Sequence, residues 1–97
     1  MKDNITKTVI RKEERRDSDN KYSYELTMKK SACVASWQIP LYSITVNMTD
    51  KNGNDTRADA TDAFSNAEKA IKFYEKVVNN LATPIDLVYI LEDEMCE

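Results

Sequence analysis

The residues of this chain with the most obvious chemistry are its carboxylates, since seventeen Asp and Glu occur in 97 residues without a single histidine. Histidine is the commonest general base and the usual partner of a catalytic serine or cysteine, and it occurs in most zinc sites. The single glycine leaves no Gly-rich loop that could hold a nucleotide phosphate. Pairs of carboxylates, Tyr and Lys remain as chemical groups, but no spacing singles out a pair. We therefore expect no catalytic residues, no cofactor and no enzyme.

The stretch DKNGND, residues 50–55, has the alternating oxygen-bearing side chains of a calcium-binding EF-hand loop. The sixth position of such a loop requires Gly and is Asp55 here, and the twelfth requires a bidentate Glu and is Thr61 here. A hairpin explains these residues better, because Asn52-Gly53 is a strong signal for a two-residue type I′ turn with positive φ at both positions. The sequence therefore predicts a turn and no metal site.

The two cysteines give no metal or redox spacing and are too few for a secreted disulfide framework. Cys33 lies in an apolar stretch and is expected to behave as a small hydrophobe. Cys96 stands in an acidic ending, where like charges disfavour the reactive thiolate. No apolar run is long enough to cross a bilayer, and the first residues lack the apolar core of a signal peptide. We expect a cytoplasmic protein.

A nucleic-acid surface is suggested by the basic run RKEERR together with five tyrosines and one tryptophan. Glu13 and Glu14 interrupt this run, however, and the sequence pI is near 5.0. Charge is also distributed unevenly: residues 1–30 hold nine Lys/Arg and six Asp/Glu, whereas residues 31–97 hold five and eleven. This gives balances of +3 and −6. We expect nucleic-acid binding to be absent and the charges to lie on a solvated surface.

Two segments, KYSYELTMKK and LYSITVNMT, alternate apolar and polar residues with the period of two that predicts a strand with one wet face. Their apolar positions include Tyr22, Tyr24 and Tyr42, which we therefore place in the core. ITKTVIRKEE is a weaker strand rich in β-branched residues, and TRADATDAF, poor in β formers, is expected to be the least stable strand. SACVASWQIP is predicted to be an irregular or edge strand, because Pro40 interrupts the ladder.

An amphipathic helix is predicted over residues 66–81, with Ser65 and Glu68 forming a capping box. Its apolar residues recur at i, i+3, i+4 and i+7, and this stripe should pack on the sheet. The stripe consists of Ala67, Ala70, Ile71, Tyr74, Val77, Val78 and Leu81.

A second, shorter helix is predicted over residues 84–94. Thr83 can cap it, Pro84 suits its first position, and Asp86 lies near the positive end of its dipole. The apolar stripe of this helix is predicted to contain Pro84, Leu87, Val88, Leu91 and Met95. A strand in IDLVYIL is the main alternative, because several of its residues favour β structure and the run is short.

These elements predict a single small α+β domain over residues 1–97, with an antiparallel sheet of four or five strands and both helices packed on one face. Residues 92–97 are expected to form a mobile acidic tail. The strand YSITV, the polar hairpin, the Ser-capped helix and NNLATPIDLVYILED together resemble a small uncharacterised family of clostridia and related Firmicutes, a domain of unknown function. The resemblance covers about residues 42–93, and TPIDL is its most specific part. It implies a compact α+β fold in a bacterial or bacteriophage cytoplasm, and it supplies no catalytic residues.

The remaining hypothesis is a non-catalytic protein–protein interaction module that binds another protein or itself, with a homodimer as one form. Its candidate interface residues are aromatic or acidic: Trp37, Phe73, Tyr89, Glu92, Asp93 and Glu94. Aromatic residues are favoured in interface cores, although isolated surface aromatics need no explanation. The alternative is a small acidic phage-type inhibitor or accessory factor of a nucleic-acid enzyme, in which EDEMCE mimics phosphate.

Overall fold

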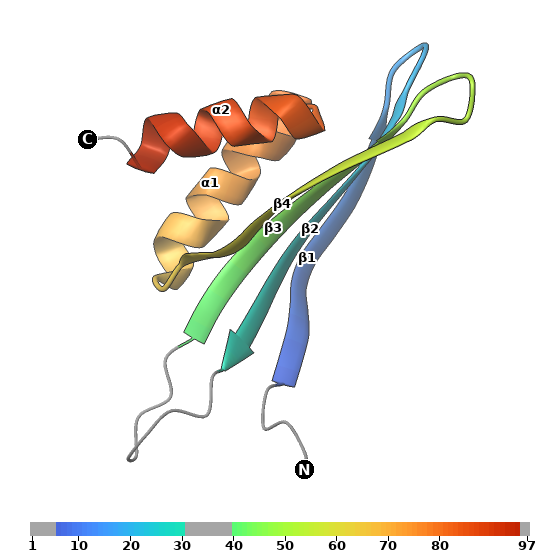
Figure 1. Cartoon of the computed structure of the whole chain (residues 1–97). Coiled ribbons are helices and arrows are strands. Elements are labelled where there is room, and N and C mark those ends of the chain that lie inside the picture. The colour runs from blue at the N-terminus through green and yellow to red at the C-terminus, as the bar shows by residue number, and fades with distance from the viewer. Residues whose placement is uncertain (1–5, 31–39, 96–97) are drawn as a thin grey trace, which may run out of the picture.

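Four strands form one antiparallel sheet in the order β1-β2-β3-β4, and two helices follow them along the chain (Figure 1). The structure, a computed structural model, describes residues 6–30 and 40–95. The strands are β1 (Thr6–Arg16), β2 (Lys21–Lys30), β3 (Pro40–Thr49) and β4 (Asp55–Phe64). The α+β prediction is confirmed, with four strands in the described part. The segment SACVASWQIP, predicted to be an irregular or edge strand, covers residues 31–40. Residues 31–39, which include Cys33 and Trp37, are outside the described part of the chain, and Pro40 is the first residue of β3.

The two faces of the sheet differ as the alternating patterns predicted. Tyr22, Tyr24 and Tyr42 point with their apolar neighbours into a core between sheet and helices, and all three are buried. The opposite face, called the open face below, carries polar side chains such as those of Ser23, Glu25 and Lys29. Thr27 departs from this plan, because it is buried although it lies on the open face.

A bulge in β4 corrects an alternation that would otherwise bury a carboxylate. In a regular strand, alternate residues point to the same face, and here these are Ala58, Ala60, Asp62 and Phe64. The register shifts, however, so that Ile44 pairs with Ala60 and Tyr42 with Phe64. Asp62 takes a positive φ of 52° at this point and lies exposed, where its carboxylate is 3.2 Å from the Lys29 ammonium. Phe64 consequently turns back into the core.

The β1–β2 and β3–β4 turns are each organised by an aspartate, Asp17 and Asp50, that accepts backbone hydrogen bonds. Asp17 accepts from the amides of Asn20 and Asp19 and from the Tyr22 hydroxyl, and the Asn20 bond contributes most to lowering its pKa. In the second turn the predicted type I′ geometry is wrong: Gly53 has a φ of 84°, but Asn52 is not among the described residues with positive φ. The loop is longer than two residues because Thr49 and Asp55 are the last paired positions.

Helix α1 (Ala67–Asn79) packs on the sheet, but its cap and stripe are shifted from the prediction. Asn66, not Ser65, is the N-cap, and its side chain accepts from the Lys69 amide at 3.0 Å. Ser and Asn are caps of similar strength, so two adjacent candidates could not be separated by sequence. The buried stripe consists of Ala70, Phe73, Tyr74, Val77 and Val78, while Ala67 and Leu81 are exposed.

The end of α1 is fixed to the sheet by a buried hydrogen bond. Leu81 takes a positive φ of 49°, and the amides of Leu81 and Ala82 return to the carbonyls of Val78 and Val77, which closes a Schellman motif. The Tyr24 hydroxyl donates to the Ala82 carbonyl at 2.9 Å. The Tyr74 hydroxyl in turn donates to the backbone carbonyl of Tyr24 at 3.3 Å.

Helix α2 (Pro84–Met95) confirms the second predicted helix and excludes the strand alternative. Thr83 and Asp86 cap it reciprocally, because the Thr83 hydroxyl accepts from the Asp86 amide and the Asp86 carboxylate accepts from the Thr83 amide. Residues 92–95, predicted as part of a mobile tail, are helical. Val88, predicted on the inner stripe, is exposed, whereas Pro84 and Leu87 are buried.

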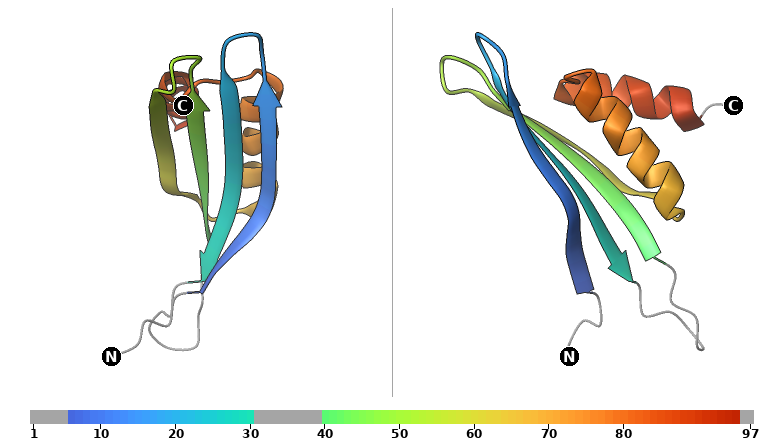
Figure 2. Two further views of the ribbon diagram at one scale, coloured as in Figure 1. Left: turned by 90° about the vertical axis from the view of Figure 1, so that its right-hand side faces the viewer. Right: turned by 180° about the vertical axis from the view of Figure 1, so that it is seen from behind.

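Both helices lie on one face of the sheet, with α2 packed mainly on β4. The loops between β1 and β2 and between β3 and β4 extend past the helices (Figures 1 and 2). A ten-residue strand is about 33 Å long and a thirteen-residue helix about 20 Å. The helical layer therefore cannot cover the full length of the sheet.

We expect Tyr24→Phe to lower the free energy of unfolding by about 1–3 kcal/mol, because the buried Ala82 carbonyl loses its donor. Urea denaturation measures the change. Tyr89→Phe is the matched control, since Tyr89 is exposed, and should change stability by less than about 0.5 kcal/mol. Equal effects of the two substitutions would contradict the role given to Tyr24.

The helix caps can be tested by alanine substitution. Asn66→Ala and Thr83→Ala should each cost about 1 kcal/mol of stability, because a helix amide loses its acceptor. Ser65→Ala should be close to neutral. A larger loss at Ser65 than at Asn66 would show that the helix starts where the sequence pattern placed it.

Candidate protein-interaction surface

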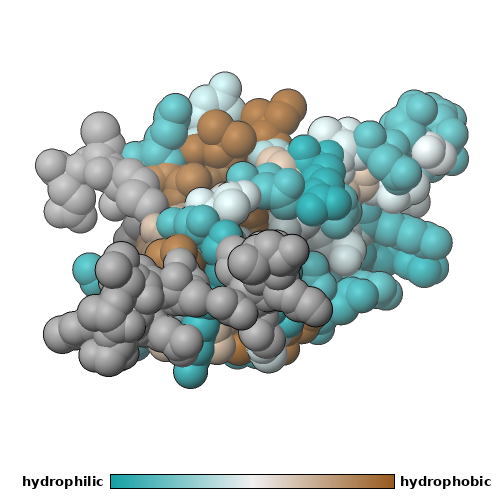
Figure 3. Space-filling model, turned by 60° about the horizontal axis from the view of Figure 1, so that its bottom comes forward, coloured by the Kyte–Doolittle hydropathy of each residue, from teal (hydrophilic) through white to brown (hydrophobic). Residues whose placement is uncertain are grey.

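The outer side of α2 carries three large apolar side chains in a row. Ile85, Val88 and Tyr89 are 63%, 49% and 65% exposed, and their spacing of i, i+3 and i+4 places them on one stripe. The inner side of the same helix packs Leu87 into the core. Figure 3 shows hydrophobic side chains gathered on the helical part of the molecule, whereas the hairpin end is almost entirely hydrophilic.

Acidic residues border this stripe. Glu92 follows at i+7 from Ile85, and Asp86 and Asp93 lie along one flank, seven residues apart. All three are exposed, and α2 contains no Lys or Arg. We call these six residues the α2 outer face: Ile85, Asp86, Val88, Tyr89, Glu92 and Asp93.

The structure brings together only part of the predicted interface. Tyr89, Glu92 and Asp93 are exposed on the α2 outer face. Glu94 belongs to α2, but its side chain is outside what the structure describes, as is all of Trp37. Phe73 is a correction: it is buried in the core with its ring centroid 5.2 Å from that of Phe64, so it is not available to a partner.

Ile85 and Val88 are members of the α2 outer face that the sequence reading missed. Their signal was present, because residues 84–91 are apolar at seven of eight positions and leave no polar side to the helix. A helix apolar all round has two sides to cover. Only one of them meets the sheet.

A second group of charged side chains stands where the edge of β1 meets α1. The bulge between Val9 and Arg11 turns Arg11, Glu13 and Arg15 toward the helical side. The Arg11 guanidinium lies 5.5 Å from the centre of the Tyr74 ring and 3.7 Å from the Glu75 carboxylate. Glu13 has a carboxylate oxygen 3.4 Å from Arg15. These contacts close the side of the core and are structural in character.

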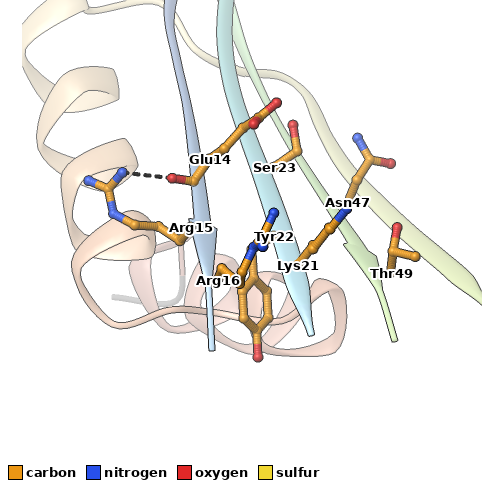
Figure 4. A pocket seen from close by; sticks show the side chains of 8 residues that line it. All are labelled: Glu14, Arg15, Arg16, Lys21, Tyr22, Ser23, Asn47 and Thr49. Atoms are coloured by element: carbon orange, nitrogen blue, oxygen red, sulfur yellow. Dashed lines mark hydrogen bonds between the residues drawn. The ribbon is translucent and has the colours of Figure 1, made fainter. Parts of the chain in front are cut away.

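A hollow of about 480 Å³ lies at the hairpin end of the sheet and is shown in Figure 4. Its lining residues come from β1, β2 and β3: Glu14, Arg15, Arg16, Lys21, Tyr22, Ser23, Asn47 and Thr49. Arg15 extends away from it and donates to the Glu14 backbone carbonyl at 3.0 Å. Glu14 is the one carboxylate among these eight residues, so the hollow offers no pair of acids for general acid–base chemistry. Its cations could contact an anion.

The buried tyrosines are held in the neutral phenol form. Desolvation raises the pKa of Tyr24 to about 12 and also raises that of Tyr74, where the nearby negative charge of Glu13 adds to the effect. Asp59, on the open face, has a lowered pKa: burial opposes the shift, but hydrogen bonds from Thr45 and Arg57 outweigh it. A phenol or carboxyl that acts as general acid or base near neutral pH would favour shifts in the opposite direction.

Within residues 6–30 and 40–95, no three Cys, Asp or Glu side chains are grouped so that they could hold a metal ion. No helix in the same residues is long and apolar enough to span a bilayer.

The fold and surface define a two-layer α+β domain, with a four-stranded antiparallel meander covered on one face by two helices. The chain belongs to a family of unknown function, DUF6514, which it matches over residues 1–97. This match extends beyond residues 42–93, the part of the chain that carries the resemblance described above. No curated protein and no solved structure matches the chain.

The tyrosine pKa values predict an alkaline limit to stability. Tyrosines of the unfolded chain deprotonate near pH 10, whereas folded Tyr24 retains its proton to about pH 12. Its contribution to stability is therefore complete below pH 10 and is lost as the pH rises toward 12. Urea denaturation across this range should show a steeper fall for the wild type than for Tyr24→Phe. Parallel pH curves would contradict the assignment.

Proposed function

We propose that this protein is a non-catalytic protein-interaction module and that it binds through the α2 outer face. The observation that carries the proposal is the exposure of Ile85, Val88 and Tyr89 on a helix whose other side is buried. Apolar side chains at i, i+3 and i+4 are the anchors by which helices bind partners. Tyr is also enriched among the residues that contribute most to binding.

The location of the protein in the cell is part of the same proposal. The residues that carry the family resemblance, TPIDL above all, imply a bacterial or bacteriophage cytoplasm, and they open the helix that presents this surface. The apolar stripe supplies contact area, and Asp86, Glu92 and Asp93 would select the charge of the partner.

A second candidate function is an acidic inhibitor or accessory factor of a nucleic-acid enzyme. It is favoured by one observation: the exposed residues of α2 include three acids and no base. In that function the carboxylates imitate phosphates and carry most of the binding, whereas in the module they border an apolar contact. The two functions therefore differ in which half of the same surface is essential.

A photo-crosslinking residue, p-benzoylphenylalanine, in place of Tyr89 should give a covalent adduct with a protein in cells that express the chain. The same residue at Asn79, which is exposed on α1, should give none. Val88→Ser should remove most of the Tyr89 adduct, because it shortens the apolar stripe. Absence of any adduct at Tyr89, or equal adducts at both positions, would refute the proposed surface.

Charge removal separates the two candidates. Glu92→Gln with Asp93→Asn keeps the helix length, which deletion of residues 92–97 would not, since α2 reaches Met95. The module predicts a reduced adduct yield that is still clearly detectable, because the apolar stripe continues to supply contact area when the bordering charges are removed. The inhibitor predicts its loss.

A further inference from the structure

The exposed apolar residues of the described chain are not scattered. Of the six large hydrophobic residues that are exposed, three form the stripe on α2, and two more, Val9 and Ile10, lie side by side on β1, 53% and 38% exposed. The sixth, Leu81, is held in the turn after α1. We call Val9 and Ile10, with Lys7 and Lys12 beside them, the β1 patch.

We propose that the α2 outer face of one molecule binds the β1 patch of a second copy, so that the chain self-associates head to tail. This inference rests on the proposed function and names the partner as the protein itself. Each patch contains exposed apolar side chains, and the two patches have opposite charge.

Charge complementarity is the first argument. The β1 patch has two lysines, Lys7 and Lys12, and no acid, whereas the exposed part of α2 has three acids and no cation.

The positions of the patches are the second argument. β1 is one edge of the sheet, and α2 packs mainly on β4, the other edge (Figure 2). Three strand spacings, about 14 Å, separate the two edges, so the patches of one molecule cannot meet each other. When the α2 outer face of one molecule binds the β1 patch of another, the pair still has one free α2 outer face and one free β1 patch. A further molecule can therefore add.

A symmetrical contact between two α2 helices is disfavoured by the same charges. It would bring six carboxylates together across one small apolar seam, and like-charge contacts of this kind oppose association. The head-to-tail contact places those carboxylates against lysines. Since each patch is small, the association should be weak and sensitive to salt.

Sedimentation velocity of the full chain tests the inference. From about 10 μM to about 1 mM protein the weight-average mass should rise beyond that of a monomer, and about 0.5 M salt should reverse most of the rise. Two blocked variants separate the patches: Val88→Ser with Tyr89→Ser on α2, and Lys7→Glu with Val9→Ser on β1. Each should be monomeric alone, and an equimolar mixture should form a dimer that does not extend.

Lys69→Glu, on the exposed side of α1, matches the charge change of the β1 variant and should associate like the wild type. A wild type that remains monomeric, a mixture that does not dimerise, or self-association of either blocked variant would overturn the head-to-tail contact. These outcomes are separate from the proposed function: a monomer that still crosslinks another protein through residue 89 refutes only the inference. Absence of both crosslinking and association refutes both.

Discussion

The hydrogen bond from the Tyr24 hydroxyl to the Ala82 carbonyl fixes the helical layer on the sheet. A buried phenol without a partner is costly, and so is a buried carbonyl, and this bond supplies a partner to both. Ala82 lies in the short link between α1 and α2, and β2 is an inner strand of the sheet. Holding this link over β2 sets the direction in which α2 leaves toward β4. It thereby determines which side of α2 meets the core and which side meets solvent.

The division of the sheet into two faces is the second constraint. In the described residues, four long strands are followed by two helices, and both helices cover the same face. The open face is consequently polar, and the surplus apolar surface appears at the margins of the helical layer: on the outer side of α2 and on the β1 edge. In the meander, strands that follow one another in the sequence are also neighbours in the sheet, so the first and the last strand lie at opposite edges. The basic N-terminal strands occupy one side of the molecule, and the acidic C-terminal helix occupies the other.

The elements were accessible from sequence wherever one local pattern was decisive. β2 alternates without interruption and was bounded correctly at Lys21–Lys30, and Thr83-Pro84 marked the start of α2. Prediction was wrong where two local solutions are nearly equal in energy. Ser65 and Asn66 are both good caps, and Val88 could belong to either side of an apolar helix. In the candidate surface, Tyr89, Glu92 and Asp93 were found as exposed residues, whereas Phe73 was misplaced because the stripe of α1 is rotated relative to the predicted one.

The sequence by itself determined the class of fold, the order of its elements and the division of charge between its two parts. These are properties of periodicity and composition, which act over a few residues or over the chain as a whole. Tertiary structure alone decided the bulge that expels Asp62, the burial of Phe73 against Phe64 and the side of α2 that remains bare. Each of these depends on which distant side chains compete for the same space in one close-packed core. That competition is settled by contacts between elements, and no local pattern records it.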